Sequence, residues 1–291
     1  MLFNEWSLVV FTILVQTAIG MLLVSEVARV VSPSSTGKSF SWQLPAISLV
    51  TGASLLFSLG HLGTPMHSIY TILNAGSSWL SREILATGGF FASVVALTVI
   101  RMKDPEAKAT GVSVVAGLLG LVTVFVMSKV YMLQTVPVWD SVSTMLGFYG
   151  TTLILGSIAG GALFGIQSNK GETIEKSDYV RIAGTFIVAA VLGLGLKFVG
   201  VPLNVISLDA TNNMGVSGID VLTMGGTFLF VACVALTFLG TAVFAWGVYK
   251  IVASKGMTAM TNISLCAFGL VLAGEIVGRL VFYGTYLRIG L

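Results

Sequence analysis

Charged residues are what this sequence has least of. Asp, Glu, Lys and Arg make up only 9% of its 291 residues, whereas a soluble domain carries about 25%. Fifteen basic and 12 acidic side chains, with a net charge of +3, are too few to cover a surface that faces water. The scarcity excludes a soluble enzyme, a nucleic-acid-binding protein and a disordered chain, and the small net charge gives no reason to expect a polyanionic partner.

Cysteine and histidine are nearly as scarce, which restricts the cofactors. Cys233 and Cys266 lie in apolar runs, where we expect buried small residues, and they cannot supply the four ligands of an iron–sulfur cluster or a structural zinc site. His61 and His67 are close in sequence with Pro65 between them, unlike haem ligands on facing helices. No glycine-rich nucleotide motif follows a strand. We therefore predict no haem, iron–sulfur cluster, flavin or metal in this chain.

Hydrophobic residues, at 55%, are abundant, and they fall into long runs. A helix needs about 20 apolar residues to cross the hydrocarbon layer of a bilayer. The runs show no period of two, which excludes a barrel, and 34 glycines suit close helix packing. We predict an all-α polytopic membrane protein, a single transmembrane domain over 1–291. The expected spans are 6–30, 42–61, 83–100, 110–132, 141–166, 180–199, 221–250 and 260–285.

The distribution of Lys and Arg predicts the orientation of these eight spans. Ten of the 15 basic residues fall on one side of the membrane and five on the other, and the richer side is expected to be cytoplasmic. Both termini then face outward. The longest predicted outer loop, Val201–Asp220, contains no Lys or Arg, which agrees with this orientation.

Ionisable residues gather at the predicted outer ends of four helices. Such groups are costly inside a membrane and mark function by default. His61 ends the second span, whereas Arg82 and Glu83 begin the third. The fourth span adds Lys129 and Tyr131, and the eighth adds Glu275, Arg279 and Tyr283. The aromatic residue Trp139 follows the fourth span.

Several of these residues also have structural interpretations. Glu275 and Arg279 are spaced i, i+4 and could pair along one helix face, and Lys129 could extend toward the headgroups. The aromatic residues Tyr131, Trp139 and Tyr283 could belong to an interfacial belt.

His61 and Glu83 are the candidates that structural interpretations explain least well. The alternative for Glu83 is compensation of the helix dipole in a first turn, and His61 could be an ordinary loop histidine. If they face each other, the pair could accept the two protons that a quinol releases when it is oxidised. The electrons would have to pass to a partner protein, because the sequence offers no redox centre.

Several segments together resemble the membrane-anchor subunits of dimethyl sulfoxide (DMSO) reductase, the DmsC family. They are 61–66 (HLGTPM), 80–84 (LSREI), 130–131 (VY), 135–137 (TVP), 273–279 (AGEIVGR) and 281–284 (VFYG). The resemblance extends from Glu5 almost to the end of the sequence. One departure is His67, where many members have Arg.

The resemblance implies a specific role. The family anchors a molybdopterin catalytic subunit and a four-cluster iron–sulfur subunit to the cytoplasmic membrane of prokaryotes, binds menaquinol and carries no haem. By resemblance, His61 and Glu83 match the quinol-site residues. Arg82, Tyr131, Glu275, Arg279 and Tyr283 are expected to complete the pocket. The terminal electron acceptor stays open.

Two other functions compete with this interpretation. One is the anchor of a polysulfide- or nitrite-reductase-type complex, which shares the chemistry but has other partners. The other is a secondary transporter, in which Lys197, Glu275 and Arg279 would line a substrate path. Transporters usually place such groups near the midplane on interrupted helices, within repeated halves. In this sequence the polar groups cluster at one face and no repeat is evident, which favours the anchor.

Overall fold

The protein forms a bundle of long helices. The structure, a computed structural model, describes residues 6–33, 40–60, 74–104, 107, 109–168, 174–208, 226–254 and 259–285. None of these residues forms a β-strand, which confirms the all-helical prediction. The described helices are α1 (Trp6–Val31), α3 (Gln43–Gly60), α5 (Trp79–Lys103), α6 (Thr110–Tyr131), α7 (Val142–Ser168), α8 (Lys176–Leu208), α10 (Thr227–Ser254) and α11 (Ala259–Gly284).

Seven of the described helices are long and apolar enough to cross a membrane. In α3 the apolar part, Gln43–Ser58, is shorter than a full span. Each helix overlaps one of the runs predicted from the sequence. The number of eight spans and the outward orientation of the termini stay predictions.

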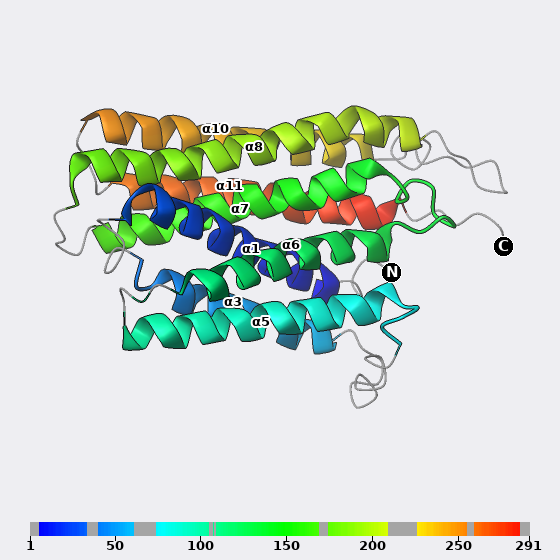
Figure 1. Cartoon of the computed structure of the whole chain (residues 1–291). Coiled ribbons are helices and arrows are strands. Elements are labelled where there is room, and N and C mark those ends of the chain that lie inside the picture. The colour runs from blue at the N-terminus through cyan, green and yellow to red at the C-terminus, as the bar shows by residue number, and fades with distance from the viewer. Residues whose placement is uncertain are drawn as a thin grey trace.

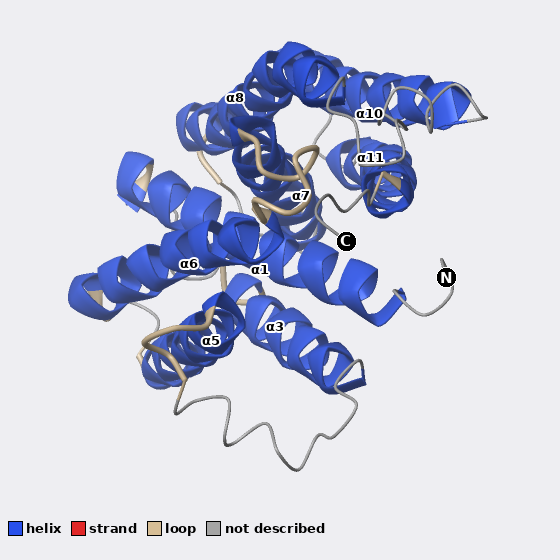
Figure 2. Cartoon of the chain, turned by 90° about the vertical axis from the view of Figure 1, so that its right-hand side faces the viewer, coloured by secondary structure: helices blue, strands red, loops and turns tan. Residues whose placement is uncertain are grey.

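Helix α1 lies between two groups of helices. Figure 1 shows α3, α5 and α6 on one side of α1 and α7, α8, α10 and α11 on the other, and Figure 2 shows the same division from one end. Two hydrophobic clusters fill the two halves, and α1 contributes to both. Val9 and Ile13 pack into the cluster with α7, α8, α10 and α11, whereas Val15 and Ile19 pack into the one with α3, α5 and α6.

The contact of α1 with α7 depends on two glycines. A Cβ atom on Gly20 would overlap the carbonyl oxygen of Thr152, and one on Gly156 would overlap the backbone of Gly20. Small residues allow helix backbones to approach this closely in a membrane. The two halves of the bundle therefore meet backbone to backbone at this crossing.

The largest difference from the predicted boundaries is in α8. It has 33 residues, about 50 Å of helix, and extends beyond the predicted span 180–199 at both ends. The predicted loop Val201–Asp220 is therefore wrong in its first part, since 201–208 is helical around Pro202 and the rest lies outside the described residues. Lys197, within the predicted span, has its charge paired inside the bundle.

Two smaller expectations are also wrong. Helix α5 begins at Trp79, because the hydroxyl of Ser78 accepts a hydrogen bond from the backbone N–H of Ser81. Glu83 therefore lies beyond the first turn. The cysteines are not both buried, since Cys266 is exposed on the bundle surface and Cys233 is half-buried.

The two ends of the bundle differ in the residues that they carry. Helices α1, α5, α7 and α10 begin at one end, and α6, α8 and α11 end there (Figure 1). We name it the Trp139 end, after the residue between α6 and α7. The opposite end, where α1 and α5 finish and α6 begins, is named the Arg101 end.

Candidate functional site

Tyr131 is the centre of an aromatic cluster at the Trp139 end. Its ring centroid lies 5.6 Å from that of Phe148, 5.7 Å from Phe282 and 5.8 Å from Tyr283. The hydroxyl groups of Tyr131 and Tyr283 are 2.8 Å apart and share a hydrogen bond. This contact joins the end of α6 to the end of α11. The structure thus brings together two residues that the sequence predicted as pocket candidates.

Trp139 closes the cluster from the segment between α6 and α7. Its ring stacks on Phe282 with centroids 4.8 Å apart and planes 9° from parallel. Its Nε1–H donates a hydrogen bond to the carbonyl oxygen of Phe282 at 2.9 Å, and its own carbonyl accepts one from Thr144 at 2.8 Å. Tyr131 and Trp139 are only 8% and 7% exposed. The interpretation of these two as interfacial belt residues is therefore wrong, because both pack inside the bundle against α11.

Glu83 is a buried carboxyl group on α5 beside this cluster. It is 6% exposed, and its carboxyl interacts electrostatically with the phenol of Tyr131. Among the described residues, no Lys or Arg lies within ion-pair distance of Glu83. The dipole interpretation is wrong, since no acidic residue occupies the first turn of α5.

Two hydroxyl groups near Glu83 were not predicted as site residues. Ser81 Oγ and Thr87 Oγ1 are buried and have no hydrogen-bond partner within the described part of the protein. Thr87 lies one turn beyond Glu83 on the same buried face of α5. Buried hydroxyls of this kind are rare, and these two could donate to a ligand. The predicted partner of Glu83, His61, lies outside the described residues, as do Pro65 and His67.

Arg82 faces the turn that precedes α5. Its Nε donates to the carbonyl oxygen of Ala75 at 2.8 Å and its Nη2 to that of Gly76 at 2.7 Å. The guanidinium also lies over the ring of Trp79, 4.4 Å from its centroid. These contacts hold Arg82 against the start of α5.

Lys129 also stays near the surface of its own helix. Its Nζ lies over the Phe125 ring, 6.0 Å from the centroid, and its side chain is half-buried.

Glu275 and Arg279 each bind a residue of another helix rather than one another. Glu275 forms an ion pair with Lys197 of α8 at 2.6 Å and accepts a hydrogen bond from Thr151 of α7 at 2.8 Å. Arg279 donates to Gln16 of α1 at 2.9 Å. The interpretation as an i, i+4 pair is wrong among these described residues. Both side chains instead connect α11 to helices on three sides.

A cavity of about 170 Å³ lies between α7, α8, α10 and α11 next to these charges. Its lining includes Lys197, Asn204, Cys233, Glu275 and Arg279. The cavity adjoins the aromatic cluster, because Phe148 and Phe282 both line it. The Phe148 ring contacts Tyr131, and its centroid lies 4.0 Å from the Arg279 guanidinium. The candidate residues therefore form two adjoining groups. The first is the Glu83 group, Glu83, Tyr131, Tyr283, Trp139 and Phe282, and the second is the Glu275 group, Lys197, Thr151, Glu275, Arg279 and Gln16.

The part of the protein that the structure describes offers no metal site. No group of three His, Cys, Asp or Glu side chains in it could hold a metal ion.

The sequence matches the family described as DMSO reductase anchor subunit (DmsC) over residues 1–285. The protein belongs to this family. The anaerobic DMSO reductase subunit YnfH of Escherichia coli K12 is 28% identical over 99% of this sequence and 97% of its own length. The C subunit of anaerobic DMSO reductase from the same organism is 26% identical over the same shares. No solved structure matches this sequence.

Family membership confirms the resemblance seen in the sequence. Together with the apolar helices, it identifies a multi-pass membrane protein and supports its role as the membrane anchor of a DMSO reductase complex. The complex joins this anchor to catalytic and electron-transfer subunits.

Four polar residues of the site were not predicted from the sequence. They are Gln16, Ser81, Thr87 and Thr151, which are uncharged, so a search for ionisable groups passes over them. Gln16 carried a usable signal, because it is the one strongly polar residue in the first apolar run between Ser7 and Ser25. The two threonines carried none, since threonine is common in membrane helices and usually bonds to its own backbone.

Proposed function

We propose that this anchor oxidises menaquinol at the Trp139 end and passes the electrons to a four-cluster iron–sulfur subunit. That subunit would pass the electrons on to a molybdopterin catalytic subunit. The anchor would hold both subunits at the cytoplasmic membrane of a prokaryote. The single observation that carries the proposal is the buried carboxyl of Glu83 beside the Tyr131–Tyr283 hydrogen bond. The names of the relatives, anaerobic DMSO reductase subunits, are consistent with such a reaction in anaerobic respiration.

Quinol oxidation requires proton acceptors and hydrogen-bonding groups in an apolar pocket. Quinol oxidation releases two protons and two electrons and leaves the quinone. Glu83 would accept one proton and His61 the other, as general bases at the edge of the hydrocarbon layer. The hydroxyls of Tyr131 and Tyr283 would bind the ring oxygens, and the stacked rings of Trp139 and Phe282 provide an apolar wall.

The Glu275 group has a supporting role in this proposal. Its charges lie next to the Glu83 group, since Arg279 contacts Phe148 and Phe148 contacts Tyr131, but each charge already has a partner on another helix. Glu275 and Arg279 would hold α11 so that Tyr283 meets Tyr131. Arg82 would hold the start of α5, where Glu83 lies.

The test compares two electron sources in membranes that contain the whole complex. Glu83→Gln keeps the shape of the side chain but removes the base, so turnover driven by a menaquinol analogue should fall about a hundredfold or more. Turnover driven by a soluble dye that reduces the partner subunits directly should stay unchanged. The matched control is Asp104→Asn, at the exposed far end of the same helix. If quinol-driven turnover of Glu83→Gln and of His61→Ala equals that of the unmodified complex, the quinol site lies elsewhere.

A further inference from the structure

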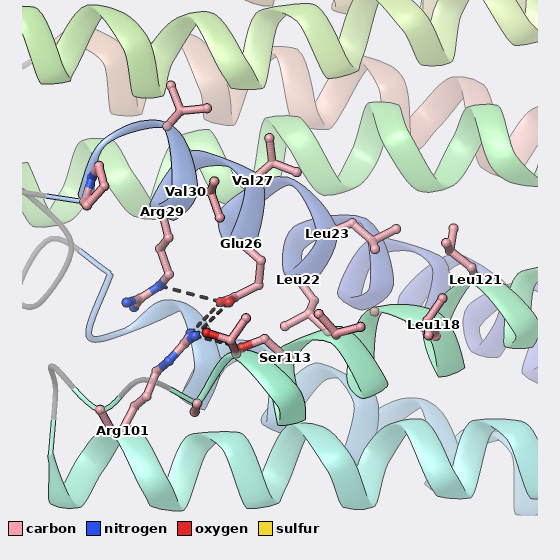
Figure 3. A pocket seen from close by; sticks show the side chains of 17 residues that line it. Leu22, Leu23, Glu26, Val27, Arg29, Val30, Arg101, Ser113, Leu118 and Leu121 are labelled. Atoms are coloured by element: carbon pink, nitrogen blue, oxygen red, sulfur yellow. Dashed lines mark hydrogen bonds and ion pairs between the residues drawn. The ribbon is translucent and has the colours of Figure 1, made fainter.

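A long groove lies on the surface of the bundle at the Arg101 end, away from the groups described above. It has a volume of about 730 Å³, within the about 300–1,000 Å³ of typical ligand sites. Figure 3 shows it between the end of α1, the end of α5 and the start of α6. Its walls are mostly apolar, with Leu22, Leu23 and Val27 on α1 and Val114, Leu118 and Leu121 on α6.

The groove opens on the apolar outer surface of the bundle. Most of α1 is buried between the two halves of the bundle, but Val27 and Val30 near its end are 53% and 79% exposed. On the opposite wall, Val114 and Leu118 of α6 are 54% and 57% exposed. A second groove of about 500 Å³, between α1 and α8, also includes Leu23 and Val27. We expect apolar surface of this extent on a membrane helix to contact acyl chains.

Three charged side chains at the end of the groove have a net charge of +1. Arg101 binds Glu26 with both terminal nitrogens, at 2.5 and 2.7 Å, and donates to Ser113 at 2.9 Å. Arg29 contacts the same carboxylate only at 3.6 Å and donates to the carbonyl oxygen of Phe40 at 3.3 Å. Figure 3 shows the two arginines meeting at Glu26. One carboxylate thus serves two guanidinium groups. Among the described residues, Arg29 has five N–H donors but donates a hydrogen bond only to Phe40, which leaves donors that an anion could accept from.

The first turn of α6 adds to the positive potential. Ala109 and Thr110, at the start of this helix, line the groove. Ala109, at the N-cap position, has no polar side chain that could accept a hydrogen bond from the first N–H groups of the helix. The first N–H groups of a helix have no acceptor within it and carry partial positive charge. The start of α6 and Arg29 line the same groove, so their positive potentials add.

We propose that this groove binds one anionic phospholipid. The phosphate contacts Arg29 and the start of α6, and an acyl chain lies along Leu23, Val27 and Leu118. Guanidinium groups bind phosphate well through paired hydrogen bonds, and basic pockets between membrane helices bind acidic headgroups. A zwitterionic lipid would bring its own cation next to Arg29, so the site selects a lipid with net negative charge. The inference is independent of quinol oxidation, because it concerns the opposite end of the bundle.

Native mass spectrometry of the purified full-length protein in mild detergent tests the proposal. The protein is titrated with palmitoyl-oleoyl phosphatidylglycerol and, separately, with phosphatidylcholine of the same acyl chains. We expect one phosphatidylglycerol to bind more tightly than all others and phosphatidylcholine to bind weakly. Arg29→Gln should weaken the tight binding about ten- to a hundredfold, since it removes charge-assisted hydrogen bonds. Lys250→Gln, an exposed cation at the same end of the bundle, is the matched control and should bind like the unmodified protein.

A second variant tests the contribution of the apolar groove independently of the charge of Arg29. Val114→Trp fills the groove but leaves Arg29, Arg101 and Glu26 in place, and it should also weaken phosphatidylglycerol binding. Free glycerol phosphate should not displace the lipid, because it lacks the acyl chain. Equal binding of the two lipids would overturn the proposal. So would unchanged binding to both Arg29→Gln and Val114→Trp, or displacement by glycerol phosphate.

Discussion

The hydroxyl oxygens of Tyr131 and Tyr283 lie 2.8 Å apart, although the two residues are 152 positions apart in the sequence. This hydrogen bond joins the last turn of α6 to the last turn of α11. It therefore connects the half of the bundle that carries Glu83 to the half that carries Glu275. A ligand that binds between the two phenols would contact both halves.

Removal of either phenol oxygen should weaken quinol binding more than it slows the reaction. Tyr131→Phe and Tyr283→Phe each keep the ring contacts and lose one hydrogen-bonding group. We expect KM for a menaquinol analogue to rise about five- to tenfold, with a smaller change in kcat, in membranes that contain the complex. The exposed Tyr249→Phe is the control. A lower kcat with an unchanged KM would assign the tyrosines to proton transfer rather than binding.

Loss of the Trp139 ring should destabilise the Trp139 end of the bundle. Trp139→Leu removes the hydrogen bond to Phe282 and the stacked contact, which together contribute about 1–3 kcal/mol. The Tm of the detergent-solubilised protein should fall measurably, and the exposed Trp246→Leu should leave it unchanged. An equal fall for both variants would mean that Trp139 contributes only apolar area.

The close approach of α1 and α7 should not tolerate a methyl group. Gly20→Ala places a Cβ against the backbone of Thr152, so the helices must separate and the folded yield and Tm should fall. Gly88→Ala, where no atom lies within 4 Å of the added Cβ, makes the same chemical change without the clash. Fluorescence-detected gel filtration of the two variants compares them. Equal profiles would show that α1 and α7 can move apart without loss.

The ion pair of Lys197 and Glu275 should be more costly to break than to remove entirely. Lys197→Met leaves the 4% exposed carboxylate of Glu275 without its cation, and breaking a buried pair costs about 3–5 kcal/mol. Adding Glu275→Gln should recover much of this loss. A double-mutant cycle in urea measures the coupling. Additive effects of the two changes would show that the pair contributes no coupling energy.

The Lys and Arg distribution makes a separate prediction about orientation. A reporter fused after Leu291 should be active only on the outer side of the membrane, since the Arg101 end carries most of the basic residues. The reporter is one that is active only outside the cytoplasm. The matched control is the same reporter inserted at Asp104, at the Arg101 end, where it should be inactive. An inactive fusion after Leu291 and an active one at Asp104 would reverse the assignment of the two faces.

The fold could be predicted from the sequence largely because a membrane allows few alternatives. Runs of apolar residues predicted every described helix, and the largest error is at the end of α8, which continues through Pro202 to Leu208. The pairing of its Lys197 could not be predicted, because Glu275 is far away in the sequence and only the tertiary structure brings the two together. The start of α5 was missed for a local reason, the capping hydroxyl of Ser78.

The candidate site could be predicted only in part. Successive membrane helices alternate in direction, and this alternation placed Glu83, Tyr131 and Tyr283 at one end of the bundle, where the structure brings them together. The alternation does not say which face of a helix a residue occupies, so it could not separate the Glu83 group from the Glu275 group. The partners of Arg279 and Trp139, Gln16 and the carbonyl of Phe282, depend on helix rotation, which the sequence alone does not give.

The position of α1 between the two halves also affects how the protein assembles during synthesis. The ribosome delivers α1 first and α11 last, and Gln16 on the first helix pairs with Arg279 on the last. Helices α3 and α6 can pack on one face of α1 as they emerge, and α5 packs against these two. Its other face, with Gly20 and Gln16, stays open to lipid until α7 and then α11 arrive. Arg279 therefore enters a membrane where its hydrogen-bond acceptor is already in place, and the last helix completes a bundle that the first one began.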